Sequence, residues 1–238
     1  MSEIFDTFFV LDFDRCLGNF EANLEMKKKL VSELTIMRGE DFQKAHDDFK
    51  ADGSSFRVLK YLKENIPDFD ENAFMGKYIE EASKKPINML EPGAVEFIDF
   101  IRSTGHYHCI MTFGDKKWQT TKVKGAGLGD IITFVVPTEY KGKCIAEWFD
   151  EESDCFIVPG ECFNDGQPRR HRQIVLIDDK LKAFDGLHPK AHGYLLQSIA
   201  RIYVSPQGKV PKNVRRVTRL DEIISYESIA KKTTSGII

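Results

Sequence analysis

Residues 8–14 of the chain read FFVLDFD, a run of four apolar residues followed at once by two aspartates around a phenylalanine. A strand with one face in water alternates apolar and polar residues, whereas this run is continuous. Continuous runs of this kind are typical of a strand that is buried on both faces of a parallel sheet. The stretch therefore predicts a parallel α/β fold whose first strand ends in Asp12 and Asp14.

Residues 20–85 follow a helical pattern instead, with apolar residues at intervals of three and four positions. Two helices are expected before residue 50. A third is expected to begin at a Ser54-Ser55 cap and a fourth at Asp70, because serine and aspartate are favoured N-caps. No strand-like run interrupts this pattern, so the sequence predicts an all-helical insert directly after the first strand.

From Pro86 onward, segments with strand and helix patterns alternate. Helices are expected at residues 91–105, 118–124 and 220–229, and strands at residues 106–111, 131–136, 174–177, 194–196 and 201–204. Strands that are separated by helix-length segments imply crossover connections. The expected fold class is α/β, with a Rossmann-like three-layer α/β/α core, a mostly parallel sheet and the helical insert after the first strand.

Residues 140–172 are the least regular part of the sequence. Residues 145–149 and 155–158 could form a hairpin, and residues 165–172, which include Arg169 and Arg170, are interpreted as a solvated basic loop.

Polar side chains follow four of the expected strands. In chain order they are Asp12 and Asp14, Thr112, Lys141 or Lys143, and Asp178 with Asp179. In an open parallel sheet the carboxyl ends of the strands share one edge, where the binding crevice lies. Neighbouring carboxylates repel unless a cation lies among them, and oxygen ligands suit a hard divalent ion, above all Mg2+. The sequence therefore predicts a Mg2+ site at this edge.

This ordered set resembles the haloacid dehalogenase (HAD)-like hydrolase superfamily, which uses four short motifs in the same order. The family's first motif, an apolar strand followed by D-x-D, is matched by VLDFDRCL at residues 10–17. Its second is a strand ending in Thr or Ser, matched by Thr112, and its third is a lysine, for which Lys141 and Lys143 are candidates. Its fourth, a strand ending in paired acids, is matched at residues 178–179.

The resemblance also implies a domain organisation. Residues 1–17 and 89–230 would form the HAD-like core, residues 18–88 a helical first-position (C1) cap, and residues 231–238 a disordered tail. The sequence departs from the family pattern at Cys16, where the family has Thr or Val. It also lacks an acid four residues after the Asp178-Asp179 pair, which indicates a variant of the fourth motif.

The resemblance implies a role for each motif residue. Asp12 would be the nucleophile that forms an aspartyl phosphate, and Asp14 the general acid and base. The implied Mg2+ ligands are Asp12, Asp14, Asp178 and Asp179 with the Phe13 carbonyl, and the implied phosphate-binding residues are Thr112, Phe113, Gly114 and Lys143. Lys143 is preferred to Lys141 for the lysine role. The dehalogenating members of the family do not need Asp14, so phosphate chemistry is favoured over cleavage of a carbon–halogen bond.

These roles predict an enzyme, a Mg2+-dependent phosphatase that hydrolyses the phosphomonoester of a small phosphorylated metabolite. One alternative is a phosphotransferase or phosphomutase, which would pass the phosphoryl group from Asp12 to an acceptor. Another is a non-catalytic binding protein with the HAD fold. The sequence indicates no particular oligomeric state.

Composition excludes several other classes of function. The chain has 37 acidic residues against 34 lysines and arginines, a formal charge of −3, so no bulk field attracts nucleic acid. Its longest apolar runs fall well short of the roughly 20 residues that cross a membrane, so no membrane partner is expected. The N-terminus has no basic segment and no cleavage signal, which predicts a cytoplasmic protein. The five cysteines are odd in number and are expected to be free thiols.

Overall fold

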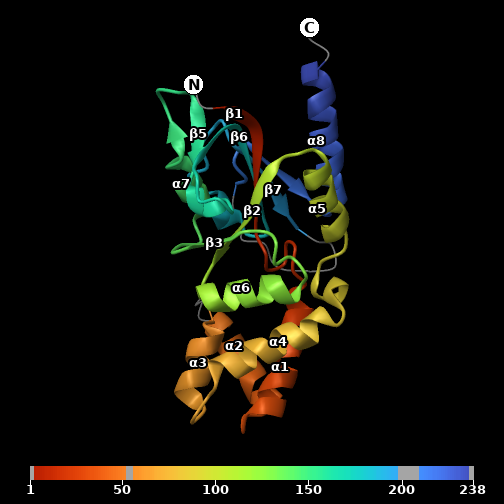
Figure 1. Ribbon diagram of the computed structural model, residues 1–238, viewed down its shortest axis with the longest axis vertical. Coiled ribbons are helices and arrows are strands. Elements are labelled where there is room, and N and C mark those ends of the chain that lie inside the picture. The colour runs from red at the N-terminus through yellow and green to blue at the C-terminus, as the bar shows by residue number, and fades with distance from the viewer. Residues whose placement is uncertain (1–2, 52–55, 198–208, 236–238) are drawn as a thin grey trace.

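The computed structural model describes residues 3–51, 56–197 and 209–235. Its strands form one eight-stranded, mostly parallel sheet, which confirms the predicted α/β fold class (Figure 1). The strands are β1 (Ile4–Leu11), β2 (Tyr107–Phe113), β3 (Thr133–Val136), β4 (Phe149–Asp150), β5 (Cys155–Val158), β6 (Arg169–Asp178), β7 (His192–Leu196) and β8 (Val214–Val217).

Strand β1 lies between β2 and β6 and runs parallel to both. Its last residue, Leu11, pairs with Ile110 of β2 and with Ile177 of β6. The other edge of β6 is shared, because β5 pairs antiparallel with its first residues and β7 pairs parallel with its last. The carboxyl ends of β1, β2 and β6 therefore meet at one edge of the sheet.

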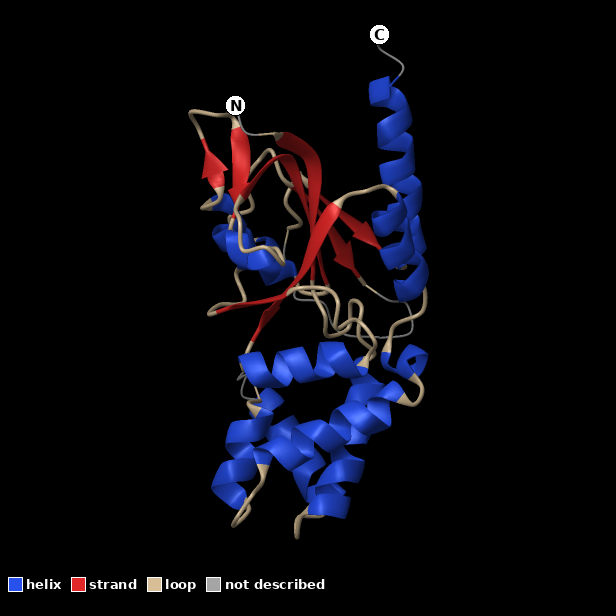
Figure 2. Ribbon diagram, in the orientation of Figure 1, coloured by secondary structure: helices blue, strands red, loops and turns tan. Residues whose placement is uncertain are grey.

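The helices surround this sheet on both faces and at one end. They are α1 (Phe20–Leu34), α2 (Gly39–Ala51), α3 (Val58–Asn65), α4 (Glu71–Ser83), α5 (Ala94–Ser103), α6 (Lys116–Gly125), α7 (Lys141–Ala146) and α8 (Leu220–Ser235), with short 3-10 helices η1 (Pro86–Met89), η2 (Gly160–Cys162) and η3 (Leu181–Phe184). Helices α5 and α8 lie on one face and α7 on the other (Figure 1). Helices α1–α4, the helical insert, lie beyond the end of the sheet, with α6 between them and the strands (Figure 2).

Successive residues of β1 point into two separate hydrophobic cores, as expected for a strand buried on both faces. Phe9 and Leu11 belong to the first core cluster, which includes side chains of α5, α8, α6 and the helical insert. Phe8 and Val10 belong to the second core cluster, which lies on the α7 face of the sheet. All four side chains are fully buried.

The start of α4 confirms the expected cap. The carboxylate of Asp70 accepts hydrogen bonds from the backbone amides of Asn72 and Ala73, each at 2.9 Å. The expected Ser54-Ser55 cap of the third helix lies outside the described residues, and α3 begins at Val58.

Residues 140–172 differ from the expectation. Residues 145 and 146, expected to begin a hairpin strand, belong instead to helix α7, so the hairpin is reduced to β4 and β5. The expected basic loop is also wrong at its end, because β6 begins at Arg169 and its first residues pair with β5. This pairing supplies hydrogen-bond partners for the backbone of the segment. Its charged side chains do not form the apolar pattern from which a strand would be predicted.

The C-terminal region departs from the prediction at β8 and at the end of α8. The strand expected at residues 201–204 lies outside the described residues, and the structure has β8 further along the chain. Helix α8 continues to Ser235, into the stretch expected to be a disordered tail, and residues 236–238 are not described.

Among the described helices, none combines the length and the apolar character needed to cross a lipid bilayer.

Candidate functional site

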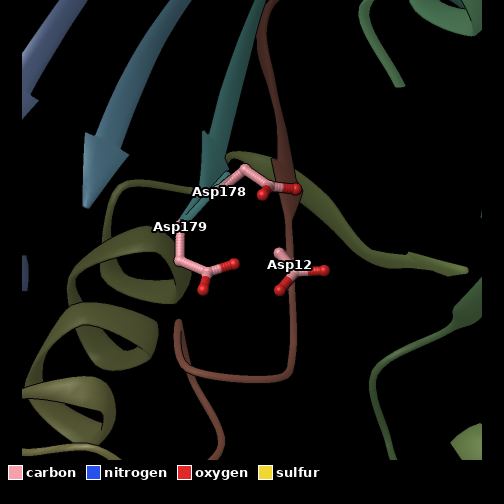
Figure 3. A group of neighbouring side chains, drawn as sticks. All are labelled: Asp12, Asp178 and Asp179. Carbon is pink, nitrogen blue, oxygen red and sulfur yellow. The ribbon is translucent and has the colours of Figure 1, made fainter. Parts of the chain in front are cut away.

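Three carboxylates converge at the carboxyl edge of the sheet (Figure 3). Asp12 directly follows β1, Asp178 is the last residue of β6, and Asp179 follows it. The backbone amide of Asp12 donates to the Ile177 carbonyl at 2.9 Å, which extends the β1–β6 pairing to the site itself. One oxygen from each carboxylate lies within 4.8 Å of the other two. The sheet register thus brings together the acids that the sequence places at two separate strand ends.

A buried lysine, Lys141, lies against two of these acids. It is the first residue of α7, and its ammonium donates to Asp12 Oδ1 and, at 2.7 Å, to Asp178 Oδ2. Asp178 Oδ1 accepts from the backbone amide of Lys180 at 2.8 Å, so both of its oxygens are engaged. Although burial disfavours its charge, Asp12 and Asp178 raise the pKa of Lys141 above its ordinary value.

The preferred lysine, Lys143, does not reach the carboxylates. Its ammonium lies 4.7 Å from the centre of the Tyr140 ring. Residues two apart on a helix point to different sides, so one turn of α7 turns Lys141 toward the strand ends and Lys143 away from them. The structure therefore places Lys141 where the sequence analysis preferred Lys143.

Crowding of the acids shifts their protonation. Burial, together with the charge of Asp178, raises the pKa of Asp12 from 3.8 to about 6 against the opposing effect of Lys141. Burial and the charges of Asp178 and Asp12 raise the pKa of Asp179 to about 8. Asp179 Oδ1 is buried and has no hydrogen-bond partner among the described residues. A cation placed among the three acids would stabilise their charged forms.

Asp14 lies apart from these three acids and forms an ion pair with a different lysine. Its carboxylate is paired with the ammonium of Lys122 from α6, a residue that sequence reasoning missed. Burial opposes the charge on Asp14, but Lys122, with smaller contributions from the charges of Lys27 and Lys180, holds the pKa of Asp14 below its ordinary value. Nothing in the local sequence marks Lys122, since only the passage of α6 across the sheet edge brings it near β1.

The Phe13 carbonyl is committed to the turn after β1. It accepts hydrogen bonds from the backbone amides of Cys16 at 3.2 Å and Gly18 at 2.6 Å. Two hydrogen bonds occupy both lone pairs of a carbonyl oxygen. The implied role of this carbonyl as a metal ligand is therefore not supported by its geometry.

The end of β2 supplies the expected hydroxyl. Thr112 is buried and lines the same cavity as Asp12, together with Phe113. Gly114 has a φ of 130°, a backbone conformation that favours glycine, and its position leaves room for the side chain of Gln119. The N-cap of α6 is Asp115, which accepts a hydrogen bond from the backbone amide of Trp118 at 2.9 Å.

The cavity at this edge has a volume of about 290 Å³. The sheet edge and α6 contribute one part of its wall and the helical insert another. The lining residues are Asp12, Asp14, Arg15, Phe20, Lys27, His46, Phe56, Val58, Thr112, Phe113, Trp118, Gln119, Lys122, Glu139, Lys141, Asp178, Asp179, Lys180 and Lys182. The structure thus encloses the predicted acids and Thr112 together with several cations that the sequence did not indicate.

Comparison with known proteins identifies solved structures that share the fold. No protein-family model matches the sequence, and no curated protein matches it. A haloacid dehalogenase-like hydrolase from Burkholderia xenovorans is similar in structure, with a TM-score of 0.59 at 16% identity over 94% of this chain and 97% of that one. The HAD-hydrolase YfnB from Bacillus subtilis, solved with bound magnesium, has a TM-score of 0.51 at 16% identity over 94% and 99%.

A third similar structure is CbbY from Rhodobacter sphaeroides, solved in complex with xylulose-(1,5)-bisphosphate. Its TM-score is 0.50 at 12% identity, over 92% of this chain and 96% of that one. Identities this low establish the fold alone. The structural comparison thus confirms the HAD-like hydrolase fold that the resemblance implied.

Proposed function

We propose that this chain, which has the HAD-like hydrolase fold, is a Mg2+-dependent phosphatase that acts through Asp12 on a small phosphorylated metabolite. The observation that carries the proposal is the meeting of Asp12, Asp178 and Asp179 with the buried ammonium of Lys141. Asp14 stands two residues beyond the proposed nucleophile and lines the same cavity. This arrangement offers a nucleophile, a proton carrier and charge stabilisation around one reacting group.

The acids fit a Mg2+ ion by their chemistry. The three carboxylates offer only oxygen donors, which suit this ion, and the buried Asp179 Oδ1 has no other described partner. Asp12 and Asp179 would hold the ion, with Asp178 beside them, and Asp14, which is paired with Lys122, would remain available as the proton carrier. When bound, Mg2+ offsets the negative charge of the carboxylates and of the phosphoryl group.

The residues of the chain can carry both halves of the reaction. In the first, an oxygen of Asp12 bonds to phosphorus as the ester bond breaks, and Asp14 gives its proton to the leaving oxygen. In the second, Asp14 removes a proton from a water molecule that attacks the aspartyl phosphate, which releases phosphate and restores Asp12. Lys141 and Thr112 would stabilise the phosphoryl oxygens.

The ion pair with Lys122 bears on the state of Asp14. It favours the carboxylate form, which is the form that removes a proton from water. The first half requires the protonated form. We expect the phosphoryl group of the substrate to compete with Asp14 for Lys122, which would raise the pKa of Asp14 when the proton donor is needed.

Release of inorganic phosphate from a panel of phosphomonoesters tests the proposal. We expect hydrolysis that requires Mg2+ and is lost on chelation. Asp12→Asn should reduce the rate by roughly three orders of magnitude or more, because an amide is a poor nucleophile. Asp6→Asn is a matched control, since Asp6 is exposed on the same strand far from its carboxyl end.

Equal rates for the wild type and Asp12→Asn in the presence of Mg2+ would contradict the mechanism. The same assay with added sugar acceptors separates hydrolysis from phosphoryl transfer. Transfer that exceeds phosphate release would identify a phosphotransferase.

A further inference from the structure

Lys27 is a buried lysine for which the described residues provide no ion-pair partner. It lies on α1 in the helical insert, is 5% exposed and lines the cavity. Within the described part of the chain, its ammonium makes no hydrogen bond and no ion pair. The ammonium lies over the Phe20 ring, whose centre is 5.7 Å from Nζ. An ammonium over an aromatic face at this distance gains only about 0.5–1 kcal/mol, which does not offset burial.

The other lysines of the described cavity wall all have carboxylate partners. Lys141 is paired with Asp12 and Asp178, and Lys122 with Asp14. The remaining two, Lys180 and Lys182, both contact Glu139. Lys27 differs from them in facing the same cavity without an acidic partner.

The surroundings of Lys27 disfavour its charge in the absence of a ligand. Burial, and the neighbouring charge of Lys122, lower the pKa of Lys27 from 10.5 to about 7, while Asp14 opposes the shift. A nearby anion would reverse the shift. Arg15, whose guanidinium lies 4.0 Å from the centre of the Phe20 ring on the cavity wall, adds positive charge to the same region.

We propose that Lys27 binds a second anionic group of the substrate, so that the substrate carries a carboxylate or a further phosphate besides the phosphoryl group that is transferred. The inference rests on the proposed function in one respect, namely that the transferred group lies at Asp12 and Lys141. The nucleophile comes from the sheet edge and Lys27 from the helical insert, and the cavity lies between them. A molecule with an anion at each end would match both walls.

Two pairs of probes test the proposal, and each pair differs by one anion. The first pair is 3-phosphoglycerate and glycerol 3-phosphate, and the second is fructose 1,6-bisphosphate and fructose 6-phosphate. Binding is measured by calorimetry with Mg2+ in the Asp12→Asn protein, so that no turnover is needed. In at least one pair, we expect the probe with the additional anion to bind about tenfold or more tightly, as a charged hydrogen bond provides. The first pair reports a carboxylate and the second a phosphate.

Lys27→Met in the same protein should reduce this ratio of dissociation constants to within about threefold, and Lys27→Arg should retain most of it. Lys29→Met is the matched control, because Lys29 lies on the same helix, is half exposed and pairs with Glu81. It should leave the ratio unchanged. Thermal unfolding of Lys27→Met should occur at a higher temperature than that of its parent, since a buried unpaired charge is removed.

Three results would overturn the inference. The first is that neither pair shows the preference in any of the proteins. The second is that Lys27→Met weakens binding of both members of a pair equally, and the third is that Lys29→Met removes the preference as completely as Lys27→Met. The second result would place Lys27 at the transferred phosphoryl group. Absence of phosphate release from the wild type would instead contradict the proposed function, and because binding is measured without turnover the two failures are distinguishable.

Discussion

At the scale of single residues, His171 is a buried titratable group whose protonation should affect stability. Its ring lies within β6, fully buried, and within the described residues neither ring nitrogen has a hydrogen-bond partner. The rings that surround it belong to Phe5, Phe8, Tyr107 and Phe163. Burial, and the charges of Arg169 and His106, lower the pKa of His171 from 6.5 to about 4. The folded protein therefore keeps this ring neutral in mildly acidic solution.

The stability of the protein should depend on pH through this ring. Between pH 6.5 and about 4 the unfolded chain binds a proton on His171 that the folded chain does not. The free energy of unfolding therefore falls as the pH decreases through this window, by about 3 kcal/mol in all, and the contribution is constant below it. Urea unfolding of the wild type and His171→Leu at about pH 7 and about pH 4.5 measures the effect.

Relative to the wild type, the variant should gain stability as the pH is lowered. Asp12 and Asp179, whose raised pKa values act in the opposite direction, titrate in both proteins and cancel in the comparison. An equal stability difference at the two pH values would show that His171 is not held neutral.

The candidate site was predictable from the sequence only in part, and single residues show why. Asp12, Asp178 and Asp179 could be placed together because each follows an apolar run, and parallel strands end at a shared edge. Lys122 and Lys27 could not, because their relation to Asp14 and to the cavity depends on how separate helices pack. Lys residues on an amphipathic helix usually face water, and nothing in their local sequence distinguishes these two.

At the scale of elements, α7 shows how a short segment escapes sequence analysis and still positions the site. Its six residues, KGKCIA, include a glycine that disfavours both helix and strand, so the local preference decides little. Packing against η3 decides the conformation. A Cβ atom at Gly142 would lie 2.8 Å from the Asp185 carbonyl oxygen and 2.9 Å from the Leu187 amide nitrogen. Only glycine allows α7 to approach this closely, next to Lys141.

Gly142→Ala should therefore lower activity by displacing the neighbouring Lys141. The added methyl group must push α7 away from the backbone near η3, and Lys141 moves with it. We expect kcat/KM for phosphate release to fall by about tenfold or more, because small misplacements at an active site are costly. Overpacking should also lower the free energy of unfolding by about 1–3 kcal/mol.

Gly76→Ala is the control for this prediction. Gly76 lies in helix α4, and a Cβ atom there would meet nothing within 4 Å. Alanine is the better helix former, so this variant should be more stable by up to about 1 kcal/mol and equally active. Wild-type activity of Gly142→Ala would show that α7 can shift without moving Lys141.

At the scale of the whole molecule, the helical insert and the sheet share one hydrophobic core. The first core cluster runs from the insert through α6 to the side chains of β1 and β6. The contact is aromatic at its centre, where the Trp118 ring of α6 lies 5.0 Å from that of Tyr78 and 5.9 Å from that of Phe74. The boundary expected from sequence, between a cap at residues 18–88 and a core, thus crosses a continuous apolar cluster. A helical pattern identifies the helices but not what covers their apolar faces.

This shared core predicts that the insert and the sheet unfold together. The two tryptophans allow a direct test, because Trp118 lies where α6 meets the insert and Trp148 lies in the second core cluster, on the other face of the sheet. In Trp148→Phe the fluorescence reports the insert contact, and in Trp118→Phe it reports the sheet. Within each variant, we expect the urea midpoint by fluorescence to coincide with that by far-UV circular dichroism, as two-state unfolding requires. A Trp118 signal that is lost at lower urea than the helical signal would mean instead that the insert separates from the sheet while both remain folded, so that the cavity wall carrying Lys27 moves as an independent unit.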